Sequence, residues 1–290
     1  MALLSTRSSR SRRPRTAFVL AGGASLGALQ AGMLRALYER EIAPDLLVGT
    51  SAGALNAAFI ASRPQTPDTA RELAAVWREL RREDVFPIHA PTLIAGLSNH
   101  AGHLVPDRPL RRLAKRHLEI ERLEQAGISL HLVAFDLLSG EEVRLSKGPA
   151  LEAVLAAAAI PGVLPPVRWD SQLLVDGGVV NNTPISHALE LGAERVYVLP
   201  TQDPRARSLA APPRGALDAA VQAFTLLVNA RLQADLVNLA REAELILLPA
   251  HNPTRVQPTD FDQADRLITS ALRAARDALA ESTVAEPLAA

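Results

Sequence analysis

The sequence has no cysteine, few aromatic residues and no excess of charge of either sign. Among its 290 residues, Phe, Trp and Tyr together make up 3%. Without cysteine there can be no disulfide, no thiolate metal ligand and no cysteine nucleophile. Lys and Arg number 31, as do Asp and Glu, so the formal net charge is zero. We therefore expect no nucleic-acid partner, because phosphate binding needs a basic surface.

Long apolar runs are also missing, and none could span a bilayer. We therefore expect a cytoplasmic protein, with peripheral contact at a membrane left open. Hydrophobic residues make up 48% of the chain, which is enough for a sizeable core. Residues 1–15 are rich in Ser, Thr and Arg and are expected to form a flexible basic tail. No linker divides residues 16–285, which we expect to form one domain, and the sequence leaves the oligomeric state open.

Strand and helix signals alternate along the chain. Strands are predicted at 16–21, 46–48, 129–138, 141–145, 172–175, 195–199 and 244–248. Helices are predicted at 27–40, 52–61, from 68 onward with Asp68 as N-cap, and at 107–118, 149–160, 184–191, 215–241 and 261–279. Residues 83–106 show no clean period and are expected to be irregular. This alternation predicts a three-layer α/β/α fold with a mostly parallel central sheet.

The segment Gly49-Thr50-Ser51-Ala52-Gly53 matches G-x-S-x-G, the pattern of a nucleophile elbow. A predicted strand precedes it and a predicted helix follows, which is the context that such an elbow requires. Glycine is expected at both flanking positions because a Cβ there would clash with neighbouring backbone. The turn would present the Ser51 hydroxyl at a helix N-terminus, where negative charge is favoured. The alternative interpretation is a plain turn in which Ser51 caps the helix.

Two further glycine-rich turns follow predicted strands. The first, Gly22-Gly23-Ala24-Ser25-Leu26-Gly27, lacks the glycine pattern of a dinucleotide site and the lysine of a P-loop. Its backbone N–H groups suit an oxyanion hole better. The second, Asp176-Gly177-Gly178, would place a carboxylate at the C-terminal edge of a parallel sheet, where active sites form. By itself, Asp176 is better explained as a turn residue that caps its own loop.

A histidine base is the usual partner of a serine nucleophile. His187 and His251 both follow Asp176 in the chain, as the order Ser, Asp, His requires. His187 lies in a predicted helix, whereas His251 lies just past the last predicted strand and is the better candidate. A Ser–Asp–His esterase with His251 as base therefore stays open.

Taken together, four ordered blocks between about residues 16 and 200 resemble the patatin-like phospholipase family. The blocks are Leu20-Ala21-Gly22-Gly23-Ala24-Ser25-Leu26-Gly27 with Gly32-Met33-Leu34, then 44–57 around Ser51, 156–167, and Asp176-Gly177-Gly178-Val179-Val180-Asn181-Asn182-Thr183-Pro184. The resemblance implies a Ser–Asp dyad without a catalytic histidine, and hydrolysis of phospholipid or other acyl-lipid esters through an acyl-enzyme.

By this resemblance Ser51 is the nucleophile, Asp176 is the base, and no cofactor or metal is implied. The implied oxyanion hole is the backbone of Gly22, Gly23, Ala24 and Ser25. The implied motif glycines are Gly27, Gly49, Gly53, Gly177 and Gly178.

The chain departs from the family pattern at two positions of the first turn. Many members have glycine where this chain has Ala24, and a cation where it has Leu26. An alanine keeps its N–H donor and is tolerated if its φ stays negative. A missing cation removes a source of charge stabilisation for the oxyanion or a substrate phosphate. A lipid-binding or regulatory protein without catalysis is therefore the first alternative to a hydrolase.

Overall fold

The computed structural model describes residues 13–87, 89–98, 102–204, 216–252 and 256–284. Its strands are β1 (Thr16–Leu20), β2 (Leu46–Thr50), β3 (Ser129–Asp136), β4 (Glu142–Leu145), β5 (Val167–Trp169), β6 (Gln172–Asp176), β7 (Arg195–Leu199) and β8 (Glu244–Leu247). Its helices are η1 (Ala24–Gly27), α1 (Ala28–Tyr38), α2 (Ala52–Ala61), α3 (Pro67–Glu79), α4 (Arg82–Val85), α5 (Ala90–Leu97), α6 (Arg108–His117), η2 (Leu123–Gln125), α7 (Ala150–Ala158), α8 (Gly178–Asn181), α9 (Ile185–Glu190), α10 (Ala216–Asn238) and α11 (Ala264–Val284).

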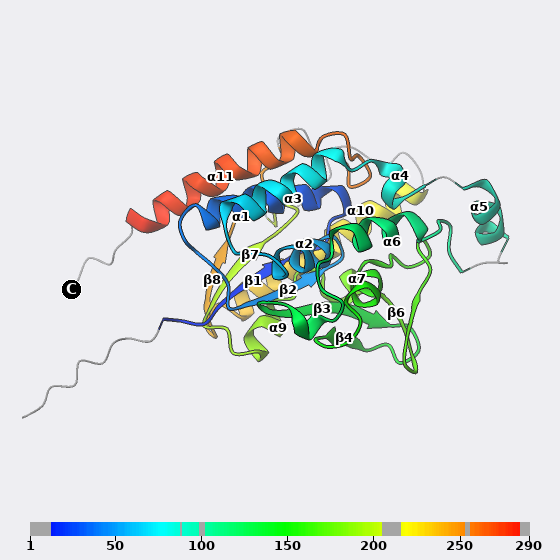
Figure 1. Ribbon diagram of the computed structural model, residues 1–290, viewed down its shortest axis with the longest axis horizontal. Helices are drawn as coiled ribbons and strands as arrows, with labels where there is room; N and C mark the ends of the chain where they lie inside the picture. The colour runs from blue at the N-terminus through cyan, green and yellow to red at the C-terminus, as the bar shows by residue number, and fades with distance from the viewer. Residues whose placement is uncertain (1–12, 88, 99–101, 205–215, 253–255, 285–290) are drawn as a thin grey trace, which may run out of the picture.

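The strands form one sheet in the order β5-β6-β3-β2-β1-β7-β8, with β4 paired to β3 (Figure 1). The five strands β3, β2, β1, β7 and β8 run parallel, whereas β4, β5 and β6 join by antiparallel pairing. Central strand β1 is buried along its whole length, as expected for a strand covered on both faces. The expected α/β fold is confirmed, with a mixed rather than purely parallel sheet.

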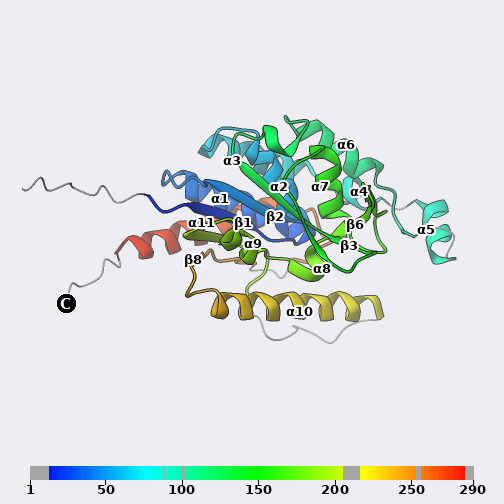
Figure 2. The same cartoon turned by 90° about the horizontal axis from the view of Figure 1, so that it is seen from below.

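Helices cover both faces of this sheet and give three layers. Alternate residues of β1 point to opposite faces, with Phe18 and Leu20 in one core and Ala17 and Val19 in the other. The larger core packs under α1, α2, α3, α6, α7 and α11, and the smaller one under α9 and α10. Figure 2 shows α10 on the opposite side of the sheet from α2, α6 and α7.

Several short elements were not expected from the sequence. Residues 83–106, predicted to be irregular, contain most of α4 and all of α5. Neither helix has a long apolar period, which is why the pattern did not predict them. The N-cap of α3 is Thr66, two residues earlier than expected, so Pro67 and Asp68 lie in the first turn of the helix. Strand β5 and helix α8 were also not predicted.

Strand β6 runs in the opposite direction to the one expected from the sequence. It runs antiparallel to β3, with Asp176 in register with Ala134. Val133, the neighbouring residue of β3, is in register with Thr50 at the end of β2. The expectation that Asp176 follows a parallel strand is therefore wrong. Asp176 nevertheless lies near the carboxyl end of β2, where the sequence places it.

The two ends of the chain differ in how much the structure describes. Most of the expected tail, residues 1–12, lies outside the described residues, and Arg13 forms an ion pair with Asp45. At the other end, α11 packs along α1 and contributes Leu267, Ile268 and Ala271 to the larger core. Within the part of the chain that is described, no helix has the length and apolar character to cross a membrane.

The contact between α1 and α11 predicts the effect of substituting Gly32→Ala. A Cβ at Gly32 would lie 2.8 Å from the backbone nitrogen of Leu272 and closer still to the carbonyl of Ile268. We expect the free energy of unfolding to fall by about 1–3 kcal/mol because α11 must move away, more than the helix-propensity gain of about 1 kcal/mol. Thermal unfolding measures this change. Gly102→Ala is the matched control, since its Cβ would meet nothing within 4 Å. A melting temperature for Gly32→Ala at or above that of the control would contradict the described packing.

Candidate active site

The candidate site lies where three parallel strands end side by side. Leu20 of β1 is in register with Gly49 of β2 and Leu199 of β7. The segments that follow these strands therefore emerge at one edge of the sheet. They contain the glycine-rich turn, Ser51 and Thr201 respectively.

The turn at Ser51 is tight and strained. Its φ of 56° and ψ of −126° are rarely adopted by a residue with a side chain. A Cβ at Gly49 would lie 2.5 Å from the carbonyl oxygen of Gly53, and one at Gly53 would overlap the carbonyl of Leu20. Only glycine therefore permits α2 to begin so close to β1. Ser51 is the N-cap residue of α2, yet its side chain makes no capping hydrogen bond, which disfavours the interpretation as a plain helix cap.

Asp176 lies beside Ser51 in a buried position. Its Oδ1 accepts a hydrogen bond of 2.8 Å from the N–H of Gly178. Burial raises the pKa of Asp176 to about 6, and hydrogen bonds from the Ser51 hydroxyl and the Gly178 N–H oppose this rise. Burial dominates because a carboxylate away from water loses its hydration. Asp176 thus caps its own loop, as the simpler interpretation holds, and the nearby Ser51 hydroxyl lowers the pKa of its carboxyl group.

The other motif glycines lie at close contacts around this pair. A Cβ at Gly177 would lie 2.6 Å from the carbonyl oxygen of Val133, and one at Gly178 would lie 3.1 Å from Oδ1 of Asp176. At Gly27, a Cβ would lie 2.8 Å from the Cβ of Ala52, which is the first residue of α2. These glycines let the segments after β1, β2 and β6 approach one another.

The glycine-rich turn offers two backbone donors rather than four. The N–H of Gly22 donates to the carbonyl of Asn182 (3.0 Å), and the N–H of Ser25 donates to the carbonyl of Pro258 (3.0 Å). The N–H groups of Gly23 and Ala24 have no partner among the described residues. Of the four N–H groups expected from the sequence, those of Gly22 and Ser25 are therefore already bonded within the protein.

Ala24 also differs from expectation in its backbone conformation. Its φ is +49°, in the left-handed region, whereas an alanine at this position is expected to be tolerated only with a negative φ. This conformation costs an L-residue about 1–2 kcal/mol relative to glycine. The departure from the family's glycine at this position therefore strains the turn while leaving its N–H in place.

Two residues not singled out from the sequence hold the glycine-rich turn. The carbonyl of Gly22 accepts hydrogen bonds from the Nδ2 of Asn182, at 3.2 Å, and from the hydroxyl of Thr201. Thr201 is buried and lies two residues after the end of β7. Its position after a strand was the available signal, since residues there share an edge with Ser51.

A buried network of polar side chains from α1, α2 and α3 also holds the glycine-rich turn in place. The Nε2 of Gln30 donates to the carbonyls of Ala21 (2.8 Å) and Leu199 (2.9 Å). The Nδ2 of Asn56 donates to Oε1 of Gln30 (2.8 Å) and to the carbonyl of Gly27 (3.0 Å). The indole of Trp77 donates to Oδ1 of Asn56 at 2.9 Å. Because these side chains are buried and satisfied, the network fixes α1, α2 and α3 around the turn.

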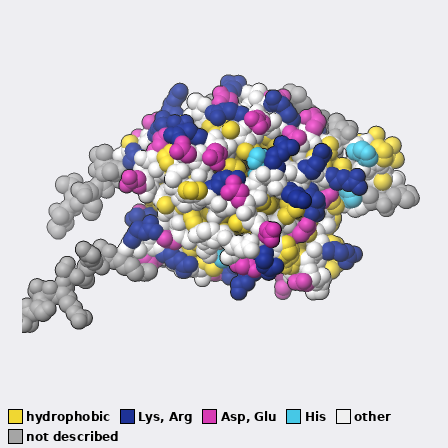
Figure 3. All heavy atoms as spheres, viewed as in Figure 1, with side chains coloured by type: hydrophobic (Ala, Val, Ile, Leu, Met, Phe, Trp, Pro, Cys, Tyr) yellow, Lys and Arg dark blue, Asp and Glu magenta, His cyan; other side chains and the backbone are white. Residues whose placement is uncertain are grey.

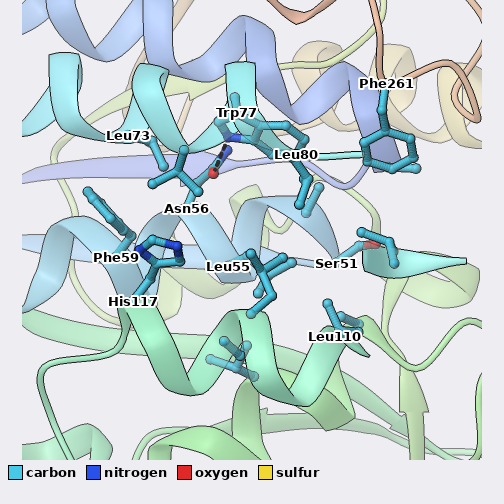
Figure 4. A pocket seen from close by; sticks show the side chains of 18 of the residues that line it. Ser51, Leu55, Asn56, Phe59, Leu73, Trp77, Leu80, Leu110, His117 and Phe261 are labelled. Carbon is cyan, nitrogen blue, oxygen red and sulfur yellow. Dashed lines mark hydrogen bonds between the residues drawn. The ribbon is translucent and has the colours of Figure 1, made fainter. Parts of the chain in front are cut away.

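An apolar pocket extends from Ser51 between α2, α3, α6 and α7. Figure 4 shows Ser51 at one end and Phe59 with His117 at the other. Ser51, Leu55 and Phe59 are spaced by four residues, so they line the pocket along one face of α2 for about 12 Å. Its walls are mainly Leu, Val, Ala and aromatic side chains, and Ala24 lies beside Ser51.

The two histidines considered as bases lie elsewhere. His251 is exposed in the coil after β8, and none of its hydrogen bonds among the described residues reaches Ser51. The ring of His187 in α9 contacts Glu142, Arg144 and Glu190. Over the same described residues, no group of three or more His, Asp or Glu could hold a metal ion.

Relatives of known sequence match the part of the chain that carries this site. An uncharacterized NTE family protein of Mycobacterium tuberculosis is 32% identical over 166 residues, which cover 57% of this chain and 27% of the relative. A patatin-like phospholipase domain-containing protein of Caenorhabditis elegans is 30% identical over 190 residues, which cover 61% of this chain and 13% of the relative. The chain thus spans less than a third of the length of each of these two relatives.

A solved structure and a family model also match this chain. The structure of VipD from Legionella pneumophila matches with a TM-score of 0.48 at 15% identity, over 93% of this chain and 67% of that one. The model of the patatin-like phospholipase family matches residues 18–189, which is more than half of the chain and includes Ser51 and Asp176. The chain belongs to the patatin-like phospholipase family.

Proposed function

We propose that this protein is a serine acyl hydrolase that cleaves ester bonds of phospholipids or other acyl lipids. The observation that carries the proposal is the placement of Ser51, in its strained turn, and the buried carboxylate of Asp176 around the same Asn182 side chain. The Ser51 hydroxyl is close enough to lower the pKa of Asp176. A serine hydroxyl is a weak nucleophile unless an adjacent base accepts its proton. Membership of the family makes lipid acyl hydrolysis the reaction class that this pair would serve.

In the proposed reaction, the oxygen of Ser51 attacks the ester carbonyl carbon while its proton passes to Asp176. The tetrahedral intermediate then collapses, the carbon–oxygen bond to the alcohol breaks, and the leaving oxygen takes the proton from Asp176. This step leaves an acyl-enzyme on Ser51. Water attacks the acyl-enzyme in the reverse order of proton transfers and releases the fatty acid.

The N–H groups of Gly23 and Ala24 are the proposed oxyanion donors. They are free of other partners among the described residues and follow β1, beside the end of β2 that carries Ser51. Fixed donors stabilise developing negative charge without reorganising during the reaction. Leu26 is buried in the larger core, so that position supplies no cation, and backbone donors carry this role.

The apolar pocket is the proposed site for the acyl chain. Its lining is mostly hydrophobic, and the polar groups of Asn56 and Trp77 on its wall bond to one another. An acyl chain placed there would lie along α2 with its carbonyl at Ser51.

We further propose that residues 16–285 form a single folding unit, because the larger core joins Phe18 of β1 to Leu279 of α11.

The proposed roles predict the behaviour of two substitutions. Ser51→Ala and Asp176→Asn should each lower kcat/KM for acyl esters by about 10⁴-fold or more, since each removes a member of the catalytic unit. A fluorophosphonate should label the wild type covalently and leave Ser51→Ala unlabelled. His251→Ala is the matched control and should retain activity. Labelling of Ser51→Ala, or loss of activity in His251→Ala, would contradict the proposed dyad.

The raised pKa of Asp176 predicts opposite effects of pH on activity and stability. The base must be ionised, so kcat/KM should fall about tenfold per unit as pH drops below about 6. Because the folded pKa exceeds the usual 3.8, protonation stabilises the fold below pH 3.8, and this gain is lost as pH rises through about 6. At pH 8, Asp176→Asn should therefore unfold with a free energy higher by up to about 3 kcal/mol. The difference should vanish near pH 4 in urea titrations, and a less stable Asn variant at pH 8 would refute the shift.

The strain at Ala24 predicts a stabilising substitution in the active site. Ala24→Gly should relieve about 1–2 kcal/mol of backbone strain, partly offset by about 0.4–1 kcal/mol of added entropy in the unfolded chain. We expect a slightly higher melting temperature and a kcat/KM within about threefold of wild type, because the N–H donor is kept. Glu41→Gly is the matched control, since exposed Glu41 also has a positive φ, of 57°. A large loss of activity in Ala24→Gly alone would instead assign a role to the methyl group.

A further inference from the structure

Helix α6 has two faces of opposite character. Its inner residues Leu110, Leu113 and Ala114 line the apolar pocket. Its outer face carries four exposed cationic side chains, at Arg108, Arg112, Lys115 and Arg116. Their spacing places them on one side of the helix. The helix that walls the pocket therefore presents a row of positive charge to solvent.

This positive charge is not neutralised within the described part of the protein. None of the four outer cations of α6 forms an ion pair with a described residue. Arg111 on the same helix differs, because it bonds to Asp107 and Glu152. No acidic residue occurs in α6, although the whole chain has a formal net charge of zero. Figure 3 shows Lys and Arg side chains gathered over α6.

Helix α5 is apolar and stands away from the body of the protein. It contains no charged residue, and it projects beyond α4 and α6 in two perpendicular views (Figures 1 and 2). Ile94 is 65% exposed and Leu93 is 36% exposed. Figure 3 shows hydrophobic side chains at this projection, on the same face of the molecule as the cations of α6. Exposed apolar side chains grouped at a projecting element indicate a contact surface.

The segment that carries α5 also borders the pocket. Val85 and Phe86, at the end of α4, line the pocket just before α5 begins. After α5, the N–H groups of Leu104 and Val105 donate to the carbonyl of Val163 (3.1 and 2.9 Å). Leu164, the next residue, lines the pocket as well. A surface on which α5 rests would therefore lie next to the pocket.

We propose that the outer face of α6 and the tip of α5 dock on an anionic lipid bilayer. Clusters of four or more Lys and Arg on an amphipathic helix favour anionic headgroups. Apolar side chains that enter the boundary between headgroups and acyl chains add to such binding. In α4, which precedes α5, Glu83 and Asp84 are matched in charge by Arg82 and by Arg81 at the N-cap, so residues 81–84 add no net charge. The exposed Leu93 and Ile94 favour a bilayer over a purely acidic protein or nucleic acid.

Docking in this orientation would bring lipid to the edge of the pocket that contains Ser51. The proposal itself concerns binding, so it holds independently of the proposed hydrolysis. It also differs from an attraction through the basic N-terminal tail, because it assigns the contact to Leu93 and Ile94 of α5 and to the outer cations of α6.

Flotation with vesicles of ether-linked lipids tests the proposal, since ether lipids bind without being hydrolysed as esters. The full chain should bind vesicles of equal parts phosphatidylcholine and phosphatidylserine, bind phosphatidylcholine alone at least about tenfold more weakly, and dissociate as salt increases. The variant Arg108→Gln/Arg112→Gln/Lys115→Gln/Arg116→Gln should lose at least about tenfold in affinity for the anionic vesicles, because each cation contributes about fivefold. Leu93→Ser/Ile94→Ser should also bind more weakly, with unchanged preference for anionic lipid.

The matched control replaces four exposed cations outside α6, as Lys147→Gln/Arg168→Gln/Arg241→Gln/Arg273→Gln, and should bind as the wild type does. Thermal unfolding checks that every variant is folded. Equal binding of wild type to neutral and anionic vesicles, or equal losses in the α6 and control variants, would overturn the proposal. Absence of binding to either vesicle would also overturn the proposal. The outer face of α6 would then be a candidate contact surface for an acidic protein. Loss of ester hydrolysis in Ser51→Ala with vesicle binding unchanged would separate this result from the proposed chemistry.

Discussion

The candidate site depends on how closely α2 starts against the end of β1. A Cβ at Gly53 would overlap the carbonyl of Leu20, so the first turn of α2 has no alternative position. Ser51 is held in its strained turn by this contact and by the hydrogen bond of its N–H to the carbonyl of Ala157, at 2.8 Å. The polar network of Gln30 and Asn56 fixes the segment after β1 against the same helix. Rigid packing on all sides therefore determines where the hydroxyl of Ser51 lies.

The site stores unfavourable free energy in two forms. Ser51 and Ala24 adopt backbone conformations that side chains disfavour, and the carboxylate of Asp176 lies away from water. Such costs persist only where the surrounding structure leaves no alternative. The larger core, which includes residues of every helix around the pocket, supplies that constraint. The raised pKa of Asp176 is a direct product of this burial.

The sequence predicted the alternating architecture well because long elements have clear periods. The turn at Ser51 was recognisable from its two glycines and the strand and helix around it. Asp176 could not be chosen without the family resemblance, since the antiparallel pairing of β6 leaves no local signal. That two N–H groups of the glycine-rich turn are bonded could not be predicted, because Asn182 and Pro258, the partners of Gly22 and Ser25, are distant in sequence. The positive φ of Ala24 was missed because tertiary contacts rather than local pattern determine it. Helices α4 and α5 were missed because neither has a long apolar period.

The route of β6 has a consequence for how the protein matures during synthesis. Ser51 sits on its turn early in the chain, whereas Asp176 arrives only after β3 has formed the edge on which β6 pairs. Thr201, which bonds to the carbonyl of Gly22, comes later still. Pairings over such long separations form slowly, because loop closure must precede them. An emerging chain that has folded only its first half therefore contains Ser51 in its turn without Asp176 and without Thr201 beside it.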